Sequence, residues 1–323
     1  MEAPFSMTGP AKLYALMLKL RPLQYGTLMA FSGELVHGAF LRWLRSAAPD
    51  VAEWLHEGNK RRLFTCSSLC YPYSETRMLD AERRNVHLPL EPAHTYTVRL
   101  TLLLGELFPL FHQALVDFST QQTREARPPF MQLGKQLFLL EEVQVTNDGA
   151  AGWTGFTSLS SLVEHARGIK LGRESELTLE FASLTTFSRG NPKTGYGANQ
   201  VMLPLPQFVF QNLARRWQDI APPELAGVVQ SAELDEYLQN DGIIIVDYNL
   251  KAHHVHFTTH QQRGFVGTCT YQLRRAREFS EAPSGESPLT LRQQLYLLAN
   301  LAFYSGIGYK TAMGLGRARI ATS

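Results

Sequence analysis

The order of strand-like and helix-like segments constrains this chain most strongly, because the same order occurs twice. In the first half, apolar runs and helical spacing predict the order strand, helix, strand, strand, helix, strand. The strands are expected at residues 12–20, 63–71, 95–104 and 131–146. The helices are expected at residues 33–46, with a short second helix after Pro49, and at residues 106–121. This order is that of the ferredoxin-like fold.

The second half repeats the order without repeating the sequence. Its strands are expected at residues 174–183, 242–259, 264–275 and 317–322, and its helices at residues 206–218 and 288–304. A turn is expected at 261–264, and a glycine cluster near 150–172 joins the halves. The chain is therefore predicted to be an α+β protein of two tandem ferredoxin-like (RRM-like, βαββαβ) domains with a central cleft. The domains are expected at residues 1–160 and 161–323.

Composition and length fit an ordinary globular protein of two domains. The chain has 323 residues, of which 44% are apolar and 19% charged. It has no run of 18 apolar residues, and its first residues, with Glu2, lack the basic region of a signal peptide. Three cysteines, Cys66, Cys70 and Cys269, argue against a disulfide framework or a structural zinc site. This cysteine usage fits a reducing compartment, so we expect a cytoplasmic protein.

The charge is small overall but unevenly distributed. The net charge is only +2, which does not by itself indicate nucleic-acid binding. Three segments contain basic residues and no acidic residue, at residues 58–74, 181–218 and 248–277. Such segregation favours a local positive field on a nearly neutral protein, although chance clustering on solvated faces gives the same pattern.

Four glycines fall within eleven positions near the end of the chain, at Gly306, Gly308, Gly314 and Gly316. Glycine loses more conformational freedom on folding than other residues, so such a cluster indicates positive φ or close approach to a ligand. Side chains that suit phosphate are interleaved with the glycines, namely Lys310, Thr311 and Arg317. Amide groups of glycine-rich turns bind anions, so this segment predicts a phosphate site. The alternative is a tight helix-to-strand connection with solvated basic residues.

Four stretches of the chain resemble one known family. The sequence 304–316 (YSGIGYKTAMGLG) resembles the C-terminal glycine-rich signature of the CRISPR-associated endoribonucleases that process precursor crRNA, within the RAMP superfamily. Residues 49–57 with 63–65, residues 181–187 and residues 263–267 resemble three further family motifs. Leu184 stands where the family usually has proline. The resemblance spans nearly the whole chain, and the glycine signature is its most specific part.

The resemblance implies a metal-independent endoribonuclease that cuts CRISPR repeat RNA. The implied reaction is attack by the 2′-hydroxyl beside the scissile phosphate, giving 2′,3′-cyclic phosphate and 5′-hydroxyl ends. A histidine can move the protons of this reaction near neutral pH, and a lysine or arginine can stabilise charge on phosphorus. The nucleophile belongs to the RNA, so the resemblance implies that no metal or cofactor is required.

The resemblance makes His56 the first candidate for the catalytic histidine. His56 matches the catalytic position of archaeal family members, in which a tyrosine and a lysine assist. The tyrosine position falls here on Leu41, which cannot exchange a proton, and Tyr25 is a weaker substitute. The lysine position falls on Arg62, with Lys60 two residues earlier. Either residue supplies positive charge, although Arg62 cannot act as an acid.

His37 is the second candidate, because several bacterial members of the family carry a functional histidine in the corresponding helix. His37 and His56 could then act as one acid and one base. A purely structural hydrogen bond is the alternative role for each of them.

Further basic residues are expected to contact RNA, and a cluster of histidines has two interpretations. Basic residues outside the glycine segment that could bind the RNA backbone are Arg189, Lys193, Arg274 and Arg275. The histidines at 253, 254, 256 and 260 suggest metal ligation by their spacing, but no carboxylate or cysteine lies nearby in the sequence. A strand edge or an RNA-facing hairpin is the favoured interpretation of that histidine cluster.

Two other functions compete with the endoribonuclease. The first is a catalytically silent RAMP protein that holds crRNA in a CRISPR effector complex. The second is a tandem RNA-recognition protein, which the missing aromatic consensus of the sheets disfavours. His37 and His56 favour the enzyme. The expected partners are CRISPR repeat RNA and precursor crRNA, with effector-complex subunits and a homodimer left open and no membrane.

Overall fold

The computed structural model describes residues 11–56, 63–121, 129–146, 152–172, 174–189, 199–275 and 287–322. Contacts divide the chain into two compact units. Unit 1 comprises residues 1–156, 254–262 and 310–315, and unit 2 comprises residues 157–253, 263–309 and 316–323. Two short segments that are late in the sequence thus belong to unit 1. No helix of the described residues is long and apolar enough to cross a membrane.

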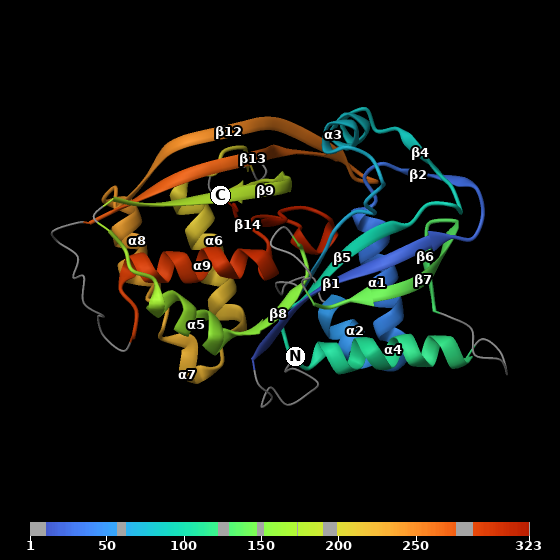
Figure 1. The fold of residues 1–323 in the computed structure, drawn as a ribbon, viewed down its shortest axis with the longest axis horizontal. Helices are drawn as coiled ribbons and strands as arrows, with labels where there is room; N and C mark the ends of the chain where they lie inside the picture. Colours follow the sequence, from blue (N-terminus) through green and yellow to red (C-terminus); the bar gives the residue numbers. More distant parts are fainter. Residues whose placement is uncertain are drawn as a thin grey trace. The chain divides into compact units, whose positions relative to one another are not determined.

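Unit 1 is an antiparallel sheet covered by helices (Figure 1). Its ferredoxin-like elements are β1 (Lys12–Pro22), α1 (Gly33–Ala47), β3 (Phe64–Cys66), β5 (Tyr96–Leu102), α4 (Leu107–Gln121) and β7 (Gln136–Gln144). The strand order β3-β5-β1-β7 is that of a βαββαβ unit. Additional elements are β2 (Gly26–Met29), α2 (Pro49–His56), α3 (Glu75–Arg83), β4 (His87–Leu90) and β6 (Phe130–Leu133).

Aromatic side chains of α1 form the core of unit 1. Phe40 lies 4.6 Å from Phe64 of β3 and 6.1 Å from Phe111 of α4, between ring centroids. Trp43 is buried beside Phe111, and its indole N–H donates to the carbonyl of Phe130 at 2.9 Å. Helical spacing puts these residues on one face of α1, so their burial fixes which residues of α1 remain near the surface.

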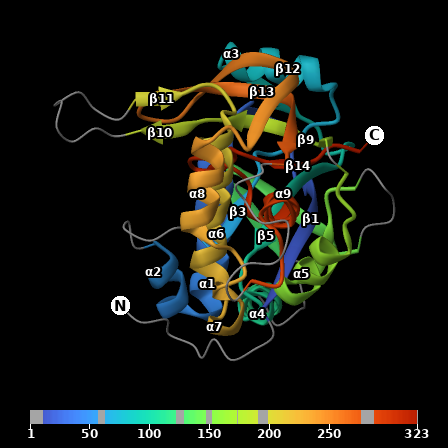
Figure 2. The ribbon, with the colours of Figure 1, turned by 90° about the vertical axis from the view of Figure 1, so that its left-hand side faces the viewer.

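Unit 2 repeats the same plan. Its ferredoxin-like elements are β9 (Glu174–Thr185), α6 (Pro206–Ile220), β12 (Ile243–His256), β13 (Gln261–Arg274), α9 (Leu291–Ser305) and β14 (Ala318–Ile320). The strand order β12-β13-β9-β14 matches that of unit 1. Figure 2 shows α6, α8 and α9 on the same side of this sheet. Additional elements are α5 (Leu159–Gly168), β10 (Phe187–Arg189), β11 (Asn199–Val201), α7 (Pro223–Ala226) and α8 (Ser231–Gln239). The 3₁₀ turn η1 (Thr311–Met313) belongs to unit 1, and β8 (Gly155–Ser158) pairs with β1 in the sheet of that unit.

The predicted tandem ferredoxin-like architecture is confirmed, while several element boundaries are wrong. The strand predicted at 131–146 is a hairpin, because Gly134 takes a φ of 60° in a two-residue turn between β6 and β7. The strand predicted at 63–71 covers only Phe64–Cys66. The turn predicted at 261–264 lies before Gln261, where β13 begins. The segment expected to join the halves contains the helix α5.

Candidate functional site

The glycine-rich segment needs its glycines for backbone reasons. Gly306, which ends α9, has a φ of 62°, Gly308 has 91°, Gly314 has 94° and Gly316 has 70°. Lys310 also has a positive φ, of 56°, which is uncommon for a residue with a side chain. The segment therefore reverses direction repeatedly in conformations that favour glycine.

The amide groups of this segment bind protein acceptors. In unit 2, the N–H of Gly308 donates to Asn212 Oδ1 at 2.9 Å, and that of Tyr309 to the carbonyl of Thr186 at 2.9 Å. The N–H of Gly316 donates to Leu184, and that of Gly306 to Ala302. The expectation of an amide cradle for phosphate is therefore not supported at these positions. Charge for an anion would come from side chains.

Residues 310–315 lie in unit 1 against α1 and β3. The carbonyl oxygen of Ala312 is 2.9 Å from His37 Nδ1 and 2.8 Å from Cys66 Sγ. A Cβ atom at Gly33 would collide with the carbonyl oxygen of Met313. The first turn of α1 and the glycine segment thus approach each other as closely as backbones allow, and only glycine fits at position 33.

The Ala312 carbonyl determines which nitrogen of His37 carries the proton. A carbonyl oxygen only accepts hydrogen bonds, so His37 Nδ1 must be the protonated donor. In the neutral ring Nε2 then has a lone pair, as a general base requires. His37 is only 6% exposed and its ring stacks on Phe64 with 5.4 Å between centroids. The imidazole is therefore held in one orientation.

Cys66 donates to the same carbonyl because its thiol stays protonated. Complete burial raises the pKa of the Cys66 thiol far above its usual range, and a hydrogen bond from the Gly314 backbone opposes this shift only partly. A protonated thiol is a weak donor, which suits its contact with Ala312.

A second polar cluster surrounds Lys310. Its Nζ lies 3.0 Å from His260 Nε2 and 3.8 Å from the centroid of the Phe257 ring. Burial lowers the pKa of Lys310, and the nearby carboxylate of Glu34 opposes that shift. All of these residues belong to unit 1.

The structure shows fewer contacts for the other catalytic candidates than for His37. His56 is exposed and is the last residue of α2. Leu41, at the position of the family's tyrosine, is buried in α1, and Tyr25 is 77% exposed. Lys60 and Arg62 lie outside the described residues.

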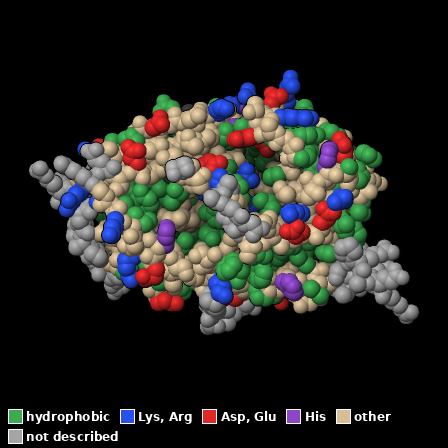
Figure 3. All heavy atoms as spheres, viewed as in Figure 1, with side chains coloured by type: hydrophobic (Ala, Val, Ile, Leu, Met, Phe, Trp, Pro, Cys, Tyr) green, Lys and Arg blue, Asp and Glu red, His purple; other side chains and the backbone are tan. Residues whose placement is uncertain are grey.

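The predicted RNA-contacting residues differ in how far they are exposed. Arg317 donates from its guanidinium to the carbonyl of Ala182 at 3.3 Å, and Thr311 is buried. Arg189, Arg274 and Arg275 are exposed, whereas Lys193 lies outside the described residues. On the face drawn in Figure 3, basic and acidic side chains are interspersed. The basic runs of the sequence thus form no single patch among the described residues of that face.

The histidines of the cluster differ in their burial and in their contacts. His253 is buried, and His254 Nε2 lies 3.2 Å from the carbonyl oxygen of Arg83. His256 packs edge-on against His254 with 5.6 Å between ring centroids. Within the described ranges, no group of three or more His, Cys, Asp or Glu residues could hold a metal ion.

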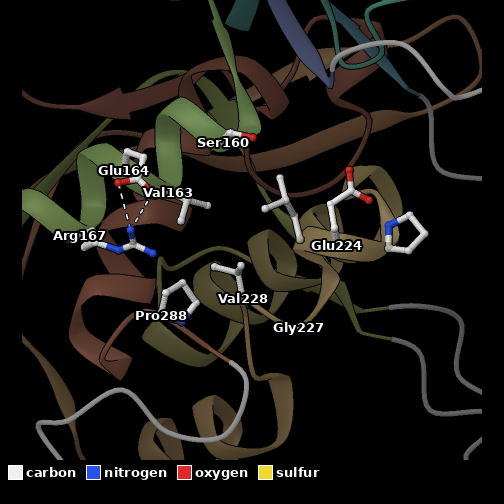
Figure 4. A pocket seen from close by; sticks show the side chains of 10 residues that line it. Ser160, Val163, Glu164, Arg167, Glu224, Gly227, Val228 and Pro288 are labelled. Atoms are coloured by element: carbon white, nitrogen blue, oxygen red, sulfur yellow. Dashed lines mark hydrogen bonds and ion pairs between the residues drawn. The ribbon is translucent and has the colours of Figure 1, made fainter.

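Two pockets lie within single units. The one in unit 2, of about 490 Å³, lies between α5, α7 and Pro288. Figure 4 shows Glu164 and Arg167 at this pocket bonded to each other, at 2.9 Å, rather than directed into the space. The pocket in unit 1, of about 310 Å³, is lined by Phe31, Glu34, Asn85, His256 and Phe257 among others.

Fold and site together define a tandem ferredoxin-like protein in which a glycine-rich segment orients a buried histidine. Residues 179–318 match the family model of the CRISPR-associated endoribonuclease Cas6. A solved product complex of Cas6 TTHB231 is 25% identical with a TM-score of 0.71, and the match covers 96% of this chain and 100% of that chain. The second half of the chain thus matches the Cas6 family model, and the whole chain is similar to a solved Cas6 structure, in agreement with the family resemblance of its motifs.

Further structures have the same fold. Thermus thermophilus Cas6 TTHB231 in a second structure is 25% identical with a TM-score of 0.61, covering 97% of this chain and 100% of that one. A product complex of Cas6 TTHA0078 is 22% identical with a TM-score of 0.63, covering 96% of this chain and 100% of that one. No curated protein sequence matches this chain.

Proposed function

We propose that this protein is an endoribonuclease that binds precursor crRNA and cuts it within each CRISPR repeat. The match to the Cas6 family model supports the reaction class, and similar structures include Cas6 complexes with a product and with a substrate mimic. The observation that carries the proposal is the hydrogen bond from His37 Nδ1 to the Ala312 carbonyl. It prepares an imidazole for proton abstraction beside the family's glycine signature.

His37 is the general base of the proposed reaction. Nε2 takes the proton from the 2′-hydroxyl, whose oxygen attacks the adjacent phosphorus. The bond from phosphorus to the 5′-oxygen then breaks, leaving a 2′,3′-cyclic phosphate and a 5′-hydroxyl. The RNA supplies its own nucleophile, so this reaction proceeds without a metal ion.

The departing 5′-oxygen requires a proton, and His56 is the proposed acid because it is exposed at the end of α2. Lys310 is the described cation nearest in sequence to Ala312 and supplies positive charge for the phosphate. Lys60 and Arg62 keep the same proposed role. Arg189, Lys193, Arg274, Arg275 and Arg317 are the further proposed backbone contacts.

Cleavage of the protein's own repeat RNA in EDTA tests the reaction. We expect one cut per repeat in EDTA, and no cut in RNA with a single 2′-deoxy substitution at the cleaved position. Equal cutting of both RNAs would exclude the 2′-hydroxyl mechanism. Binding of the repeat RNA without any cut would favour the catalytically silent crRNA-binding protein instead.

Single-turnover rates of histidine variants test the assignments. His37→Ala and His56→Ala should each slow cleavage by about 100- to 10,000-fold while RNA affinity changes little. His165→Ala is the control, because His165 is exposed on α5 of unit 2. Wild-type rates for both His37→Ala and His56→Ala would remove this active-site assignment.

A further inference from the structure

The tip of the β12–β13 hairpin, residues 254–262, forms with Lys310 a feature of unit 1 outside the proposed acid and base. The rings of Phe257 and His260 stack with 5.1 Å between centroids and 6° between planes. The Lys310 ammonium lies over the Phe257 ring and reaches His260 Nε2 at 3.0 Å. An ammonium that donates to an imidazole and contacts an aromatic face is a cation held in one place.

The Phe257 ring also lines the pocket of about 310 Å³. This volume is at the lower end of the range of about 300–1,000 Å³ for small-molecule sites, which suits a single nucleobase. Phe31 meets Phe257 edge-on at 5.0 Å, while Asn85 and His256 contribute polar groups to the lining. Aromatic walls with a few polar groups are the surroundings in which proteins bind unstacked RNA bases.

Two hydrogen bonds hold the hairpin tip beside α1. Glu34 Oε2 accepts from the backbone N–H of Thr258 at 2.8 Å and from its hydroxyl at 2.9 Å. The pocket is therefore formed before any ligand arrives, which reduces the entropy lost on binding. Glu34 lines the pocket, and the second oxygen of its carboxylate can accept a further hydrogen bond.

We propose that this pocket and the Lys310–His260 pair form a subsite for one unstacked nucleotide of the RNA. The base enters the pocket against Phe257 and Phe31, and the phosphate binds the Lys310 ammonium. The Glu34 carboxylate accepts from an exocyclic amino group, so adenine, cytosine or guanine binds in preference to uracil. This subsite rests on the proposed function, since it requires the RNA substrate.

Affinity for modified repeat RNAs tests the subsite. A 2′-deoxy substitution at the cut prevents cleavage, and each nucleotide is replaced in turn by an abasic one. We expect one position at which the abasic RNA, and RNA with uracil there, bind about tenfold more weakly to the wild-type protein. If no position of the RNA behaves in this way, the proposed subsite is overturned.

The variant Glu34→Gln tests whether the RNA position found in this way binds in the pocket. The amide oxygen can still accept from Thr258, whereas the amide nitrogen would replace the free acceptor with a donor. We expect this variant to lose the discrimination against uracil while binding the abasic RNA as the wild type does. Glu53→Gln, an exposed acid of the same unit, should retain the discrimination. Unchanged discrimination in Glu34→Gln would overturn the subsite.

Lys310→Met tests the phosphate contact. The slope of log affinity against log salt concentration should fall by about 0.7, the value for one phosphate of a single strand. The control Lys135→Met removes an exposed lysine of the β6–β7 turn in the same unit. Equal slopes in Lys310→Met and wild type would remove the phosphate contact.

Cleavage of unmodified repeat RNA separates the two proposals. A protein that cuts the repeat but discriminates at no position lacks the subsite and keeps its function. A protein that neither binds nor cuts repeat RNA contradicts both.

Discussion

His37 and Ala312 are separated by 275 residues in the chain, yet the imidazole Nδ1 of one lies 2.9 Å from the carbonyl oxygen of the other. Cys66 donates to the same oxygen at 2.8 Å. The last glycine-rich segment thus orients the imidazole of His37, in addition to carrying Lys310. Disturbing the backbone at Ala312 should therefore affect catalysis.

Gly33→Ala is the variant that disturbs this backbone. Its Cβ would collide with the Met313 carbonyl, and the cost of such overpacking is typically about 1–3 kcal/mol. We expect lower stability and slower single-turnover cleavage. Gly38→Ala on the same helix is the control, because nothing lies within 4 Å of its Cβ. It should raise helix stability by about 0.5–1 kcal/mol and leave cleavage unchanged. Equal urea midpoints for the two variants would contradict the prediction.

Glu34→Gln should lower the pKa of Lys310 further. Burial already lowers this pKa, and the Glu34 carboxylate opposes the shift, so removing the negative charge favours the neutral amine. The readout is acetylation of Lys310 against pH, followed by mass spectrometry. Its midpoint should move to lower pH in Glu34→Gln and stay in place in Glu53→Gln. A midpoint that moves upward would show that Glu34 does not interact with Lys310 in this way.

The three cysteines should differ in reactivity. Burial raises the pKa of Cys269 to about 11 and raises that of Cys66 further, and both side chains are buried. The thiolate is the reactive form, so neither should react readily with iodoacetamide at pH 8. Cys70 is only partly buried and should be alkylated first. Peptide mapping after brief alkylation checks this order, and urea should abolish it.

The same two thiols should make the free energy of unfolding fall at alkaline pH. The folded-state pKa values of Cys66 and Cys269 are raised, so their contribution is complete below the unfolded thiol pKa of about 8.5. As the pH rises from there toward the folded values, the unfolded state loses protons that the folded state keeps. Each thiol should then lower the free energy of unfolding by up to about 1.4 kcal/mol per pH unit. Urea unfolding at pH 8, 9 and 10 measures this decline, which Cys269→Ala should reduce.

Thr290→Ala should weaken the start of α9. Thr290 Oγ1 accepts from the Gln293 backbone, and Gln293 Oε1 accepts from the Thr290 backbone at 3.0 Å, forming a capping box. Loss of such an N-cap costs about 1 kcal/mol. Thr290→Ser keeps the hydroxyl and serves as the control. Thermal unfolding should separate the two variants by a few degrees, whereas identical curves would show that the cap contributes nothing.

Periodicity identified the elements that bury one continuous apolar face. The helix α1 was predictable because Phe40 and Trp43 recur at helical spacing, and β9 because its apolar residues alternate. The hairpin of β6 and β7 was not separable from one long strand, since only the positive φ at Gly134 divides it. Short polar helices such as α3 lack an apolar stripe that a sequence pattern could detect.

The sequence identified residues of the candidate site, but it did not indicate which of them contact one another. Lys310 and His37 stood out through a glycine cluster and a family resemblance. No pattern connected Lys310 with His260, or Glu34 with Thr258, because these pairs are 50 and 224 residues apart. Such pairs come together only through packing of distant segments, and their local sequences carry no trace of it.

Two βαββαβ orders, the glycine-rich segment and the family resemblance could be read from the amino-acid sequence, because periodicity, backbone freedom and motif spacing are local properties. The role of the glycines became visible only in the folded structure. Their amides bind protein acceptors, while the Ala312 carbonyl sets the proton on His37. Hydrogen bonds between distant segments depend on the packed position of both partners, and that position exists only after the chain has folded.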